Sequence, residues 1–394
     1  MLVHIESVKV IDVRIPFSRP RGSAVDPAFA KTACLVITRG GGHLGFAEAP
    51  VFAAPTYDEQ FVAQTHAAIE LFASAMLAKG RRDGSAVELA VEEVVASLAR
   101  YRGNSAAKAA IEISLLDLYS RQRGIGAAGT LAEYARQLGH LGMAGRFAAL
   151  DEEEPIPAQG TSLALLEDET ERSLEAARLS RLGYRRLKVK VDAPFEPDAL
   201  KRLVAAADIE MSADANGTLA DRDQLAALLG VGFSYVEQPF APGSLHDLAQ
   251  LHNVGLRSGS ARIALDESIS GPGALRDAIA LVPFSVAVLK VSRLGGIAGL
   301  LEAVRIAEAA KIGFYIGGMY DTPVLRRLNA LLVKALEPPE ISDLGPDSDF
   351  FGSQIPPSVV RRGDGELMLV GDEGISGPFV PAEEHAAGVS EMLV

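Results

Sequence analysis

Between about residues 161 and 346 the sequence alternates short apolar runs with stretches of helical periodicity. Eight of the runs have strand character, and a helical stretch separates most of them from the next. Parallel strands need such crossovers, and eight strands in under two hundred residues favour a closed barrel over an open sheet. Most runs are apolar throughout, as expected when helices cover the outside of the sheet. We therefore predict an α/β fold built around a closed barrel.

The segments on either side of the barrel have a different pattern. Residues 1–135 begin with two strand-like stretches joined by glycine turns and continue with three helical stretches, at 58–77, 86–101 and 106–124. This order is typical of an α+β domain. The tail is rich in Gly and Pro and holds short strand-like pieces. We expect an α+β capping domain at 1–135, the barrel at 136–350, and a tail at 351–394 that packs on the capping domain.

Composition excludes several classes of partner. Lys and Arg number 38 against 51 Asp and Glu, which gives a formal charge of −13. A nucleic-acid partner is disfavoured, because a phosphate backbone attracts a basic surface. No apolar run approaches the roughly eighteen residues of a membrane span, and the first residues do not resemble a signal peptide. Cys34 is the only cysteine, so no internal disulfide forms. We expect a cytoplasmic protein without a membrane partner.

Charged residues stand at the ends of five successive barrel strands. The strands end in KVK, DAN, EQP, DES and LKV, and their charged residues follow one another at intervals of 23 to 29 residues. Barrel active sites form at the carboxyl ends of the strands, so these side chains should meet at one mouth. They are Lys188, Lys190, Asp214, Glu237, Asp266 and Lys290.

Three carboxylates that converge on one point repel one another unless a cation lies between them. Ligation by oxygen alone selects a hard divalent ion, so we expect Asp214, Glu237 and Asp266 to bind Mg²⁺, with Mn²⁺ possible. A lysine beside that ion and a second lysine should have a lowered pKa. Lys190 would then serve as a general base, while Lys188 lowers its pKa and helps to hold a substrate carboxylate.

Each residue also has a simpler interpretation. Lys188 and Lys190 could lie on a solvated strand face, Asp214 could form a turn, and Asp266 could cap a helix. Glu237 and Lys290 are harder to explain in this way, since each ends an apolar strand where burial of a charge is costly. The shared order and spacing of all six residues favour the catalytic interpretation.

The chain resembles the enolase superfamily, muconate-lactonizing-enzyme subgroup, over nearly its whole length. The matching motifs are KVK at 188–190, DAN at 214–216, EQP at 237–239, DES at 266–268 and LKVSRLGG at 289–296. The resemblance implies a (β/α)7β barrel, similar to a TIM barrel, with an α+β capping domain. It also implies that Lys190 and Lys290 are an acid/base pair. The reaction would remove a proton α to a carboxylate and give an enediolate stabilised by Mg²⁺.

Within the subgroup the chain is most similar to o-succinylbenzoate synthases and N-succinylamino-acid racemases. That similarity rests on GFAEAPVFAAPTYDE near residue 50, GGM at 317–319 and SDLGPDSDFF at 342–351. It implies substrate contacts from the loop at 19–23 and from the barrel mouth. The expected contacts are Ser162, Asn216, Arg19, Met319, Tyr320 and Asp321. The family pattern after GGM is Leu-Glu-Thr-Gly, whereas this chain has Tyr-Asp-Thr-Pro, which should change the pocket wall.

Several alternatives stay open at this point. Two lysines on opposite sides of an enediolate suit racemisation and dehydration equally, and the sequence does not separate them. A muconate-type cycloisomerase or a dipeptide epimerase fits the surrounding motifs less well. A barrel that only binds a small molecule, without catalysis, should have lost one of the metal-binding carboxylates or one of the lysines. None of these residues is missing. We expect a small-molecule carboxylate as substrate and a homo-oligomer as the assembled form.

Overall fold

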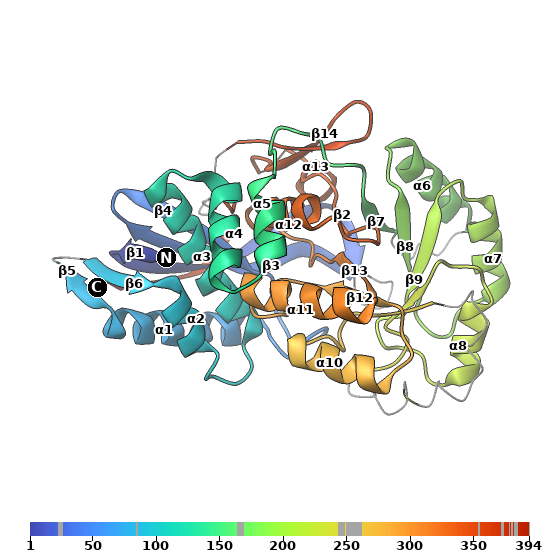
Figure 1. Cartoon of the computed structure of the whole chain (residues 1–394). Helices are drawn as coiled ribbons and strands as arrows, with labels where there is room; N and C mark the ends of the chain where they lie inside the picture. The colour runs from blue at the N-terminus through green and yellow to red at the C-terminus, as the bar shows by residue number, and fades with distance from the viewer. Residues whose placement is uncertain are drawn as a thin grey trace.

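Figure 1 shows the computed structural model of the chain. It describes residues 1–22, 27–83, 86–163, 169–242, 249, 262–353, 355–371, 374–377, 379, 381 and 385–393. The helix expected from the segment HDLAQLHN lies almost entirely outside these residues. None of the described helices is both long and apolar enough to cross a membrane.

An antiparallel sheet and three helices form the part of the molecule that holds the N-terminus. The sheet has the order β16-β2-β3-β4. Its strands are β2 (Ser7–Gly22), β3 (Pro27–Gly40), β4 (His43–Ala49) and β16 (Ala386–Leu393). Helices α1 (Val62–Lys79) and α3 (Ser105–Arg123) cover one face. Alternate residues of β2 are buried on opposite faces, Val8 and Val10 with the helices and Val13 and Ile15 in a second apolar cluster.

The predicted helix at 86–101 is wrong over its first turn and a half. Residues Ala86–Ala90 form strand β6, and helix α2 begins only at Val91 and ends at Leu98. Val87 and Leu89 lie two residues apart, so in a strand both point to the buried face. Pairing of β6 with β1 (Leu2–Ile5) and β5 (Arg81–Asp83) supplies the hydrogen bonds that a helix would have made internally.

Two helices that the sequence analysis did not assign follow α3. They are α4 (Gly126–Gln137) and α5 (Leu141–Ala148), which pack against each other. Helix α5 also contacts α12 (Pro323–Leu336) of the barrel, so this pair lies where the two parts of the chain meet (Figure 1).

Seven parallel strands form a curled sheet with the order β13-β12-β11-β10-β9-β8-β7. They are β7 (Gly160–Leu163), β8 (Arg186–Lys190), β9 (Glu210–Asp214), β10 (Val236–Glu237), β11 (Ile263–Leu265), β12 (Val286–Leu289) and β13 (Gly313–Ile316). The helices between them are α6 (Glu169–Arg181), α7 (Pro197–Ala206), α8 (Arg222–Leu229), α10 (Pro272–Leu281) and α11 (Ile297–Ala310). The parallel sheet covered by crossover helices confirms the predicted α/β fold.

A short eighth segment joins the two edges of this sheet. The Gly160 amide on β7 donates to the Ser342 carbonyl at 2.8 Å, and the Asp343 amide donates to the Ile316 carbonyl on β13 at 3.0 Å. The segment ISDLG therefore occupies the eighth strand position that the sequence pattern predicted. Tyr235 and Tyr315 belong to a buried apolar cluster with Ala264, Val286 and Val288.

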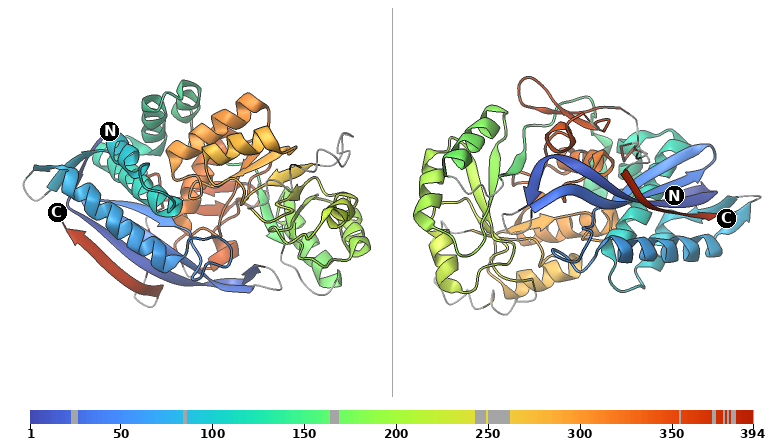
Figure 2. Two further views of the ribbon diagram at one scale, coloured as in Figure 1. Left: turned by 90° about the horizontal axis from the view of Figure 1, so that it is seen from below. Right: turned by 180° about the vertical axis from the view of Figure 1, so that it is seen from behind.

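The C-terminal tail makes contacts with both parts of the chain. Strand β16 pairs antiparallel with β2, with Ser390 opposite Val10, and Figure 2 shows it along the edge of the N-terminal strands. Strands β14 (Val359–Arg361) and β15 (Leu367–Leu369) form a hairpin, and Leu367 exchanges backbone hydrogen bonds with Ile156 just before the barrel. Helix α13 (Ser348–Phe351) lies between the barrel and this hairpin in sequence.

Candidate active site

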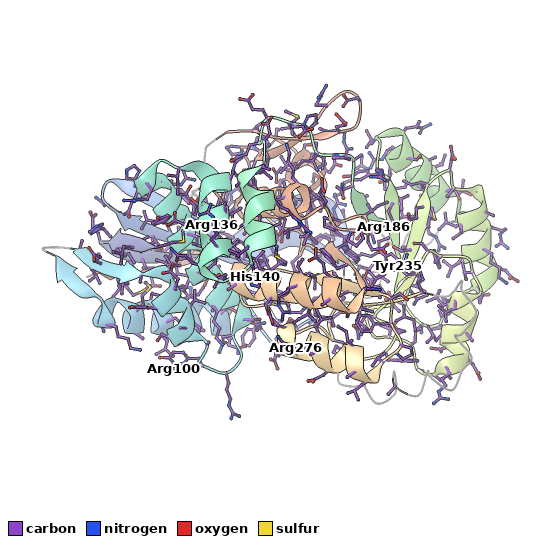
Figure 3. The ribbon with its side chains drawn as sticks, viewed as in Figure 1. Arg100, Arg136, His140, Arg186, Tyr235 and Arg276 are labelled. Atoms are coloured by element: carbon purple, nitrogen blue, oxygen red, sulfur yellow. The ribbon has the colours of Figure 1, made fainter. Side chains whose placement is uncertain are left out.

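Strand β8 points a column of three basic side chains into the barrel. Arg186, Lys188 and Lys190 alternate with Leu187 and Val189, which are buried in the apolar core on the other face. Arg186 is fully buried, and its guanidinium lies 5.5 Å from the Tyr235 ring centre (Figure 3). This placement excludes the simpler interpretation of KVK, in which the two lysines lie on a solvated strand face.

Lys188 is enclosed by acidic partners. Its ammonium donates to Glu237 at 3.0 Å and to Asp343 at 2.8 Å, and it lies 3.8 Å from Asp214. Burial works against its positive charge, but the three carboxylates outweigh burial and raise the pKa of Lys188 well above its usual value. At neutral pH this residue is a fixed positive charge in the floor of the site.

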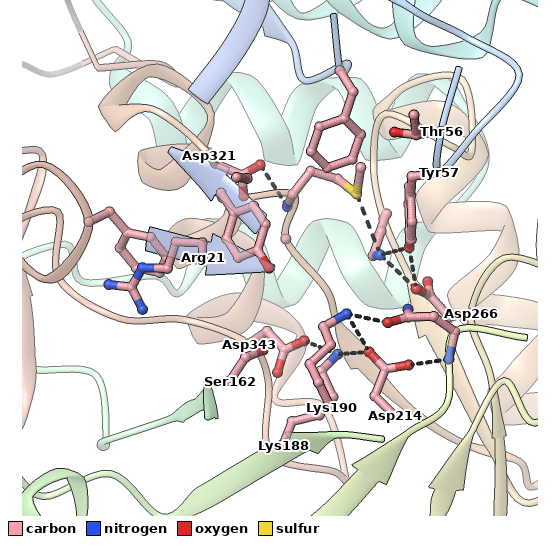
Figure 4. A pocket seen from close by; sticks show the side chains of 18 of the residues that line it. Arg21, Thr56, Tyr57, Ser162, Lys188, Lys190, Asp214, Asp266, Asp321 and Asp343 are labelled. Carbon is pink, nitrogen blue, oxygen red and sulfur yellow. Dashed lines mark hydrogen bonds and ion pairs between the residues drawn. The ribbon is translucent and has the colours of Figure 1, made fainter. Parts of the chain in front are cut away.

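Lys190 stands one step nearer the mouth of the barrel. Its ammonium donates to Asp214 at 3.0 Å and to the Asn216 side-chain oxygen at 2.5 Å (Figure 4). Burial opposes the charge here too, but Asp214 outweighs it and raises the pKa of Lys190. The sequence analysis expected a lowered pKa, because it placed a metal ion among the carboxylates. In the structure these carboxylates accept hydrogen bonds from lysine, arginine and tyrosine side chains, and they stabilise the charged lysines.

A second cluster of charges lies at the ends of β11 and β12. Lys290 donates to Asp266 at 2.7 Å and to the Tyr57 hydroxyl at 2.9 Å, and the Arg293 guanidinium also binds Asp266. Burial favours the neutral acid, but the two cations outweigh it and lower the pKa of Asp266. Tyr57 comes from the loop after β4, so a residue of the N-terminal part completes the barrel site.

The three predicted metal ligands stand on neighbouring strands at similar heights. Asp214 and Glu237 are direct partners across β9 and β10, and Asp266 follows β11. Burial raises the pKa of Glu237 above its usual value, and Lys188 only partly opposes this effect. Among the described residues, no group of three acidic, histidine or cysteine side chains is arranged to ligate a metal ion. Each of these carboxylates is turned toward a lysine, an arginine or a tyrosine.

A cavity of about 690 Å³ opens above these charges, between the barrel and the N-terminal part. Most predicted substrate contacts line it, namely Ser162, Asn216, Met319, Tyr320 and Asp321. Arg19 instead lies 3.8 Å from Glu175 of α6, with 64% of its side chain exposed. Arg21, two residues further along β2, lines the cavity (Figure 4). Ser23, the end of the predicted covering loop, lies outside the described residues.

Sequence reasoning missed four side chains of this site: Tyr57, Arg293, Tyr315 and Asp343. Asp343 could have been found, because it follows the eighth strand segment and the strand-end rule applies to it as well. Tyr315 is less accessible to such reasoning. It lies within the apolar run GFYI, and only the barrel geometry shows that its hydroxyl reaches Glu237, at 2.5 Å. Tyr57 and Arg293 lie in loops, which carry no such periodic signal.

Comparisons with known proteins agree with the barrel and capping-domain fold. A family model described as enolase C-terminal domain-like matches residues 171–377. The o-succinylbenzoate synthase of Enterococcus faecalis is 29% identical over 341 residues, which cover 83% of this chain and 82% of that protein. The N-succinylamino acid racemase of Thermus thermophilus is 29% identical over 349 residues, with 88% and 86% covered.

Solved structures share the whole architecture. A probable mandelate racemase from Alicyclobacillus acidocaldarius matches with a TM-score of 0.80 at 22% identity, over 99% of this chain and 98% of that one. A muconate lactonizing enzyme from Pseudomonas fluorescens, complexed with muconolactone, matches with a TM-score of 0.76 at 23% identity, over 94% and 95%. With the family model spanning more than half of the chain, these matches confirm the predicted family: the protein belongs to the enolase C-terminal domain-like family and is an enzyme of the enolase superfamily.

Proposed function

We propose that this enzyme removes the proton α to the carboxylate of a small acid, with Lys190 and Lys290 as the two proton-transferring groups. The observation that supports this most strongly is their placement. Lys190 ends β8 and Lys290 follows β12, four strands further along an eight-position barrel, and both line the same cavity. A substrate between them presents opposite faces of its α-carbon to the two ammonium groups.

The proposed divalent ion is Mg²⁺, with Mn²⁺ as the second candidate. The donor set is suitable, since Asp214, Glu237 and Asp266 offer only carboxylate oxygens and come from adjacent strands. They would have to turn from their present lysine and arginine partners to share an ion. When bound, such an ion stabilises negative charge that develops on the substrate carboxylate. Lys188, held between Glu237 and Asp343, adds fixed positive charge beside it.

The proposed substrate class follows from the relatives. The synthase and the racemase cover most of this chain at equal identity, so we propose either dehydration to an o-succinylbenzoate-type product or racemisation of an N-succinylamino acid. A chloromuconate cycloisomerase of Pseudomonas putida is 25% identical, which makes cycloisomerisation a further candidate. A dipeptide epimerase is another, because the L-Ala-D/L-Glu epimerase of Bacillus subtilis matches with a TM-score of 0.75.

Proton NMR in D₂O tests the proposal. With Mg²⁺ present, the wild-type enzyme should exchange the α-proton of at least one member of a panel of N-succinylamino acids, dipeptides and the synthase substrate. Lys190→Ala and Lys290→Ala should each lower the rate at which substrate is converted to product by about a thousandfold or more. This loss is within the range for removal of a positioned acid or base. Lys201→Ala, which removes an exposed lysine paired with Asp198, is the matched control and should keep wild-type turnover.

The two enantiomers of an N-succinylamino acid show which lysine acts on which face of the α-carbon. If each lysine serves one face, each variant should fail to interconvert the enantiomers but still exchange deuterium into the one whose proton faces the remaining lysine. Full activity in either lysine variant, with the fold intact by circular dichroism, removes that lysine from the mechanism.

A further inference from the structure

Tyr320 has an unusual backbone conformation that its surroundings hold in place. Its φ is +55°, a left-handed value that is unfavourable for a residue with a side chain. The residues on either side are tied down. Met319 accepts a hydrogen bond from the Lys31 ammonium at 2.9 Å, and the Asp321 carbonyl accepts one from Arg326 at 2.6 Å. The loop therefore fixes the direction in which the Tyr320 side chain leaves the backbone.

Two aromatic rings then fix the ring itself. Phe17 of β2 meets the Tyr320 ring edge-to-face, with centroids 5.6 Å apart and an interplanar angle of 72°. Phe350 of α13 lies 6.3 Å away in a tilted arrangement. Such pairs orient aromatic side chains beyond simple burial. Tyr320 is nevertheless only half-buried and lines the cavity, so the hydroxyl is the part of it left to interact with a ligand.

The surroundings of this hydroxyl are rich in donors. The Lys190 ammonium and the Arg21 guanidinium line the same cavity as Tyr320. Arg21 enters the cavity on the side away from Tyr57 and Asp266 (Figure 4). Its Nε is buried without a hydrogen-bond partner. Within the described part of the chain, the Tyr320 hydroxyl makes no hydrogen bond, so it is free to donate to a bound molecule.

We propose that the Tyr320 hydroxyl selects the substrate by donating a hydrogen bond to a carboxylate at the end of the arm attached to the α-carbon. This inference rests on the proposed function and narrows its substrate class to acids whose arm ends in a carboxylate. An apolar arm would cover the Tyr320 hydroxyl without giving it an acceptor, which costs affinity. Leucine, the residue of the family pattern at this position, has no hydrogen-bonding group, so this preference would be a property of the present chain.

Two isosteric acids provide the test. N-succinylphenylglycine and N-(4-methylpentanoyl)phenylglycine differ only in whether the arm ends in a carboxylate or in an isopropyl group. Both are titrated calorimetrically, with Mg²⁺, into the wild-type protein and into Tyr320→Phe. The wild type should favour the succinyl acid, and the ratio of the two affinities should fall about ten- to a hundredfold in the variant, as for loss of a hydrogen bond to a charged group.

Tyr119→Phe is the matched control, because it removes a hydroxyl that donates to Glu133 in the N-terminal part and does not line the cavity. Its affinity ratio should equal that of the wild type. If Tyr320→Phe weakens both acids equally, or neither, the selecting role is refuted, and it is equally refuted if the wild type binds neither acid. Binding is independent of turnover, so Tyr320-dependent binding of the succinyl acid without α-proton exchange supports this inference and refutes the proposed chemistry.

Discussion

A buried carboxyl of helix α3 should give the protein a measurable dependence of stability on pH. Glu112 is fully enclosed, accepts a hydrogen bond from the Tyr134 hydroxyl at 2.7 Å, and accepts one from the Ala298 amide at 2.9 Å. Ala298 lies in the first turn of α11, so a side chain of the N-terminal part caps a barrel helix. Burial, only partly opposed by these hydrogen bonds, raises the pKa of Glu112 to about 7.

The direction of the effect follows from this raised pKa. Between pH 4.5, the usual value for the unfolded chain, and about 7, the folded protein holds a proton that the unfolded chain has lost. The free energy of unfolding should therefore fall as the pH rises through this range. The difference between the two pKa values corresponds to about 3 kcal/mol. Glu112→Gln keeps an oxygen for both donors but cannot ionise, so its stability should lack this decrease.

Chemical denaturation at pH 4.5 and pH 8 measures the effect. The free energy of unfolding of Glu112→Gln, relative to the wild type, should rise by about 3 kcal/mol between the two pH values. Glu133→Gln is the control, because Glu133 accepts from Tyr119 at 3.0 Å in the same helix pair but is only half-buried. Its difference from the wild type should be the same at both pH values. A Glu112→Gln protein with the full wild-type pH dependence would refute the reasoning.

Two further outcomes are expected. Gly45→Ala should lower the free energy of unfolding by about 3 kcal/mol, because a methyl group there overlaps the Ser114 carbonyl oxygen of α3. Gly145→Ala in α5, with no described atom within 4 Å of the new methyl group, should raise it by about 1 kcal/mol; equal effects of the two changes would contradict the packing of β4 on α3. Removal of divalent ions with a chelator should abolish α-proton exchange, and Mg²⁺ should restore it and raise the melting temperature; exchange that survives chelation would exclude the proposed metal requirement.

The barrel could be predicted well because its signals are local. Five successive strands are short apolar runs that end in charged residues, so the sequence alone indicates where Lys190, Asp214 and Lys290 stand. The seven-stranded parallel sheet with its eighth segment follows that order. Even Asp343, which was missed, lies where the same rule applies.

The features that the sequence did not reveal depend on distant partners. Residues 86–90 became a strand because β1 lies beside them, a contact that no local periodicity encodes. Tyr57 reaches Asp266 across more than two hundred positions of sequence. The pKa of Lys190 depends on which charges surround its ammonium group and not on residue type alone, and among this chain's own groups Asp214 outweighs burial and raises it.

The eighth strand segment links the integrity of the barrel to that of the site. Asp343 donates its amide to Ile316 of β13, and its carboxylate holds both Arg186 and Lys188 of β8. A chain in which this segment has not joined the sheet edges therefore lacks an edge hydrogen bond, the Asp343 partner of Arg186 and one of the carboxylate partners of Lys188. Repulsion between those cations then opposes any partly assembled barrel. Closure of the barrel and charge compensation at the base of the site therefore depend on the same residue.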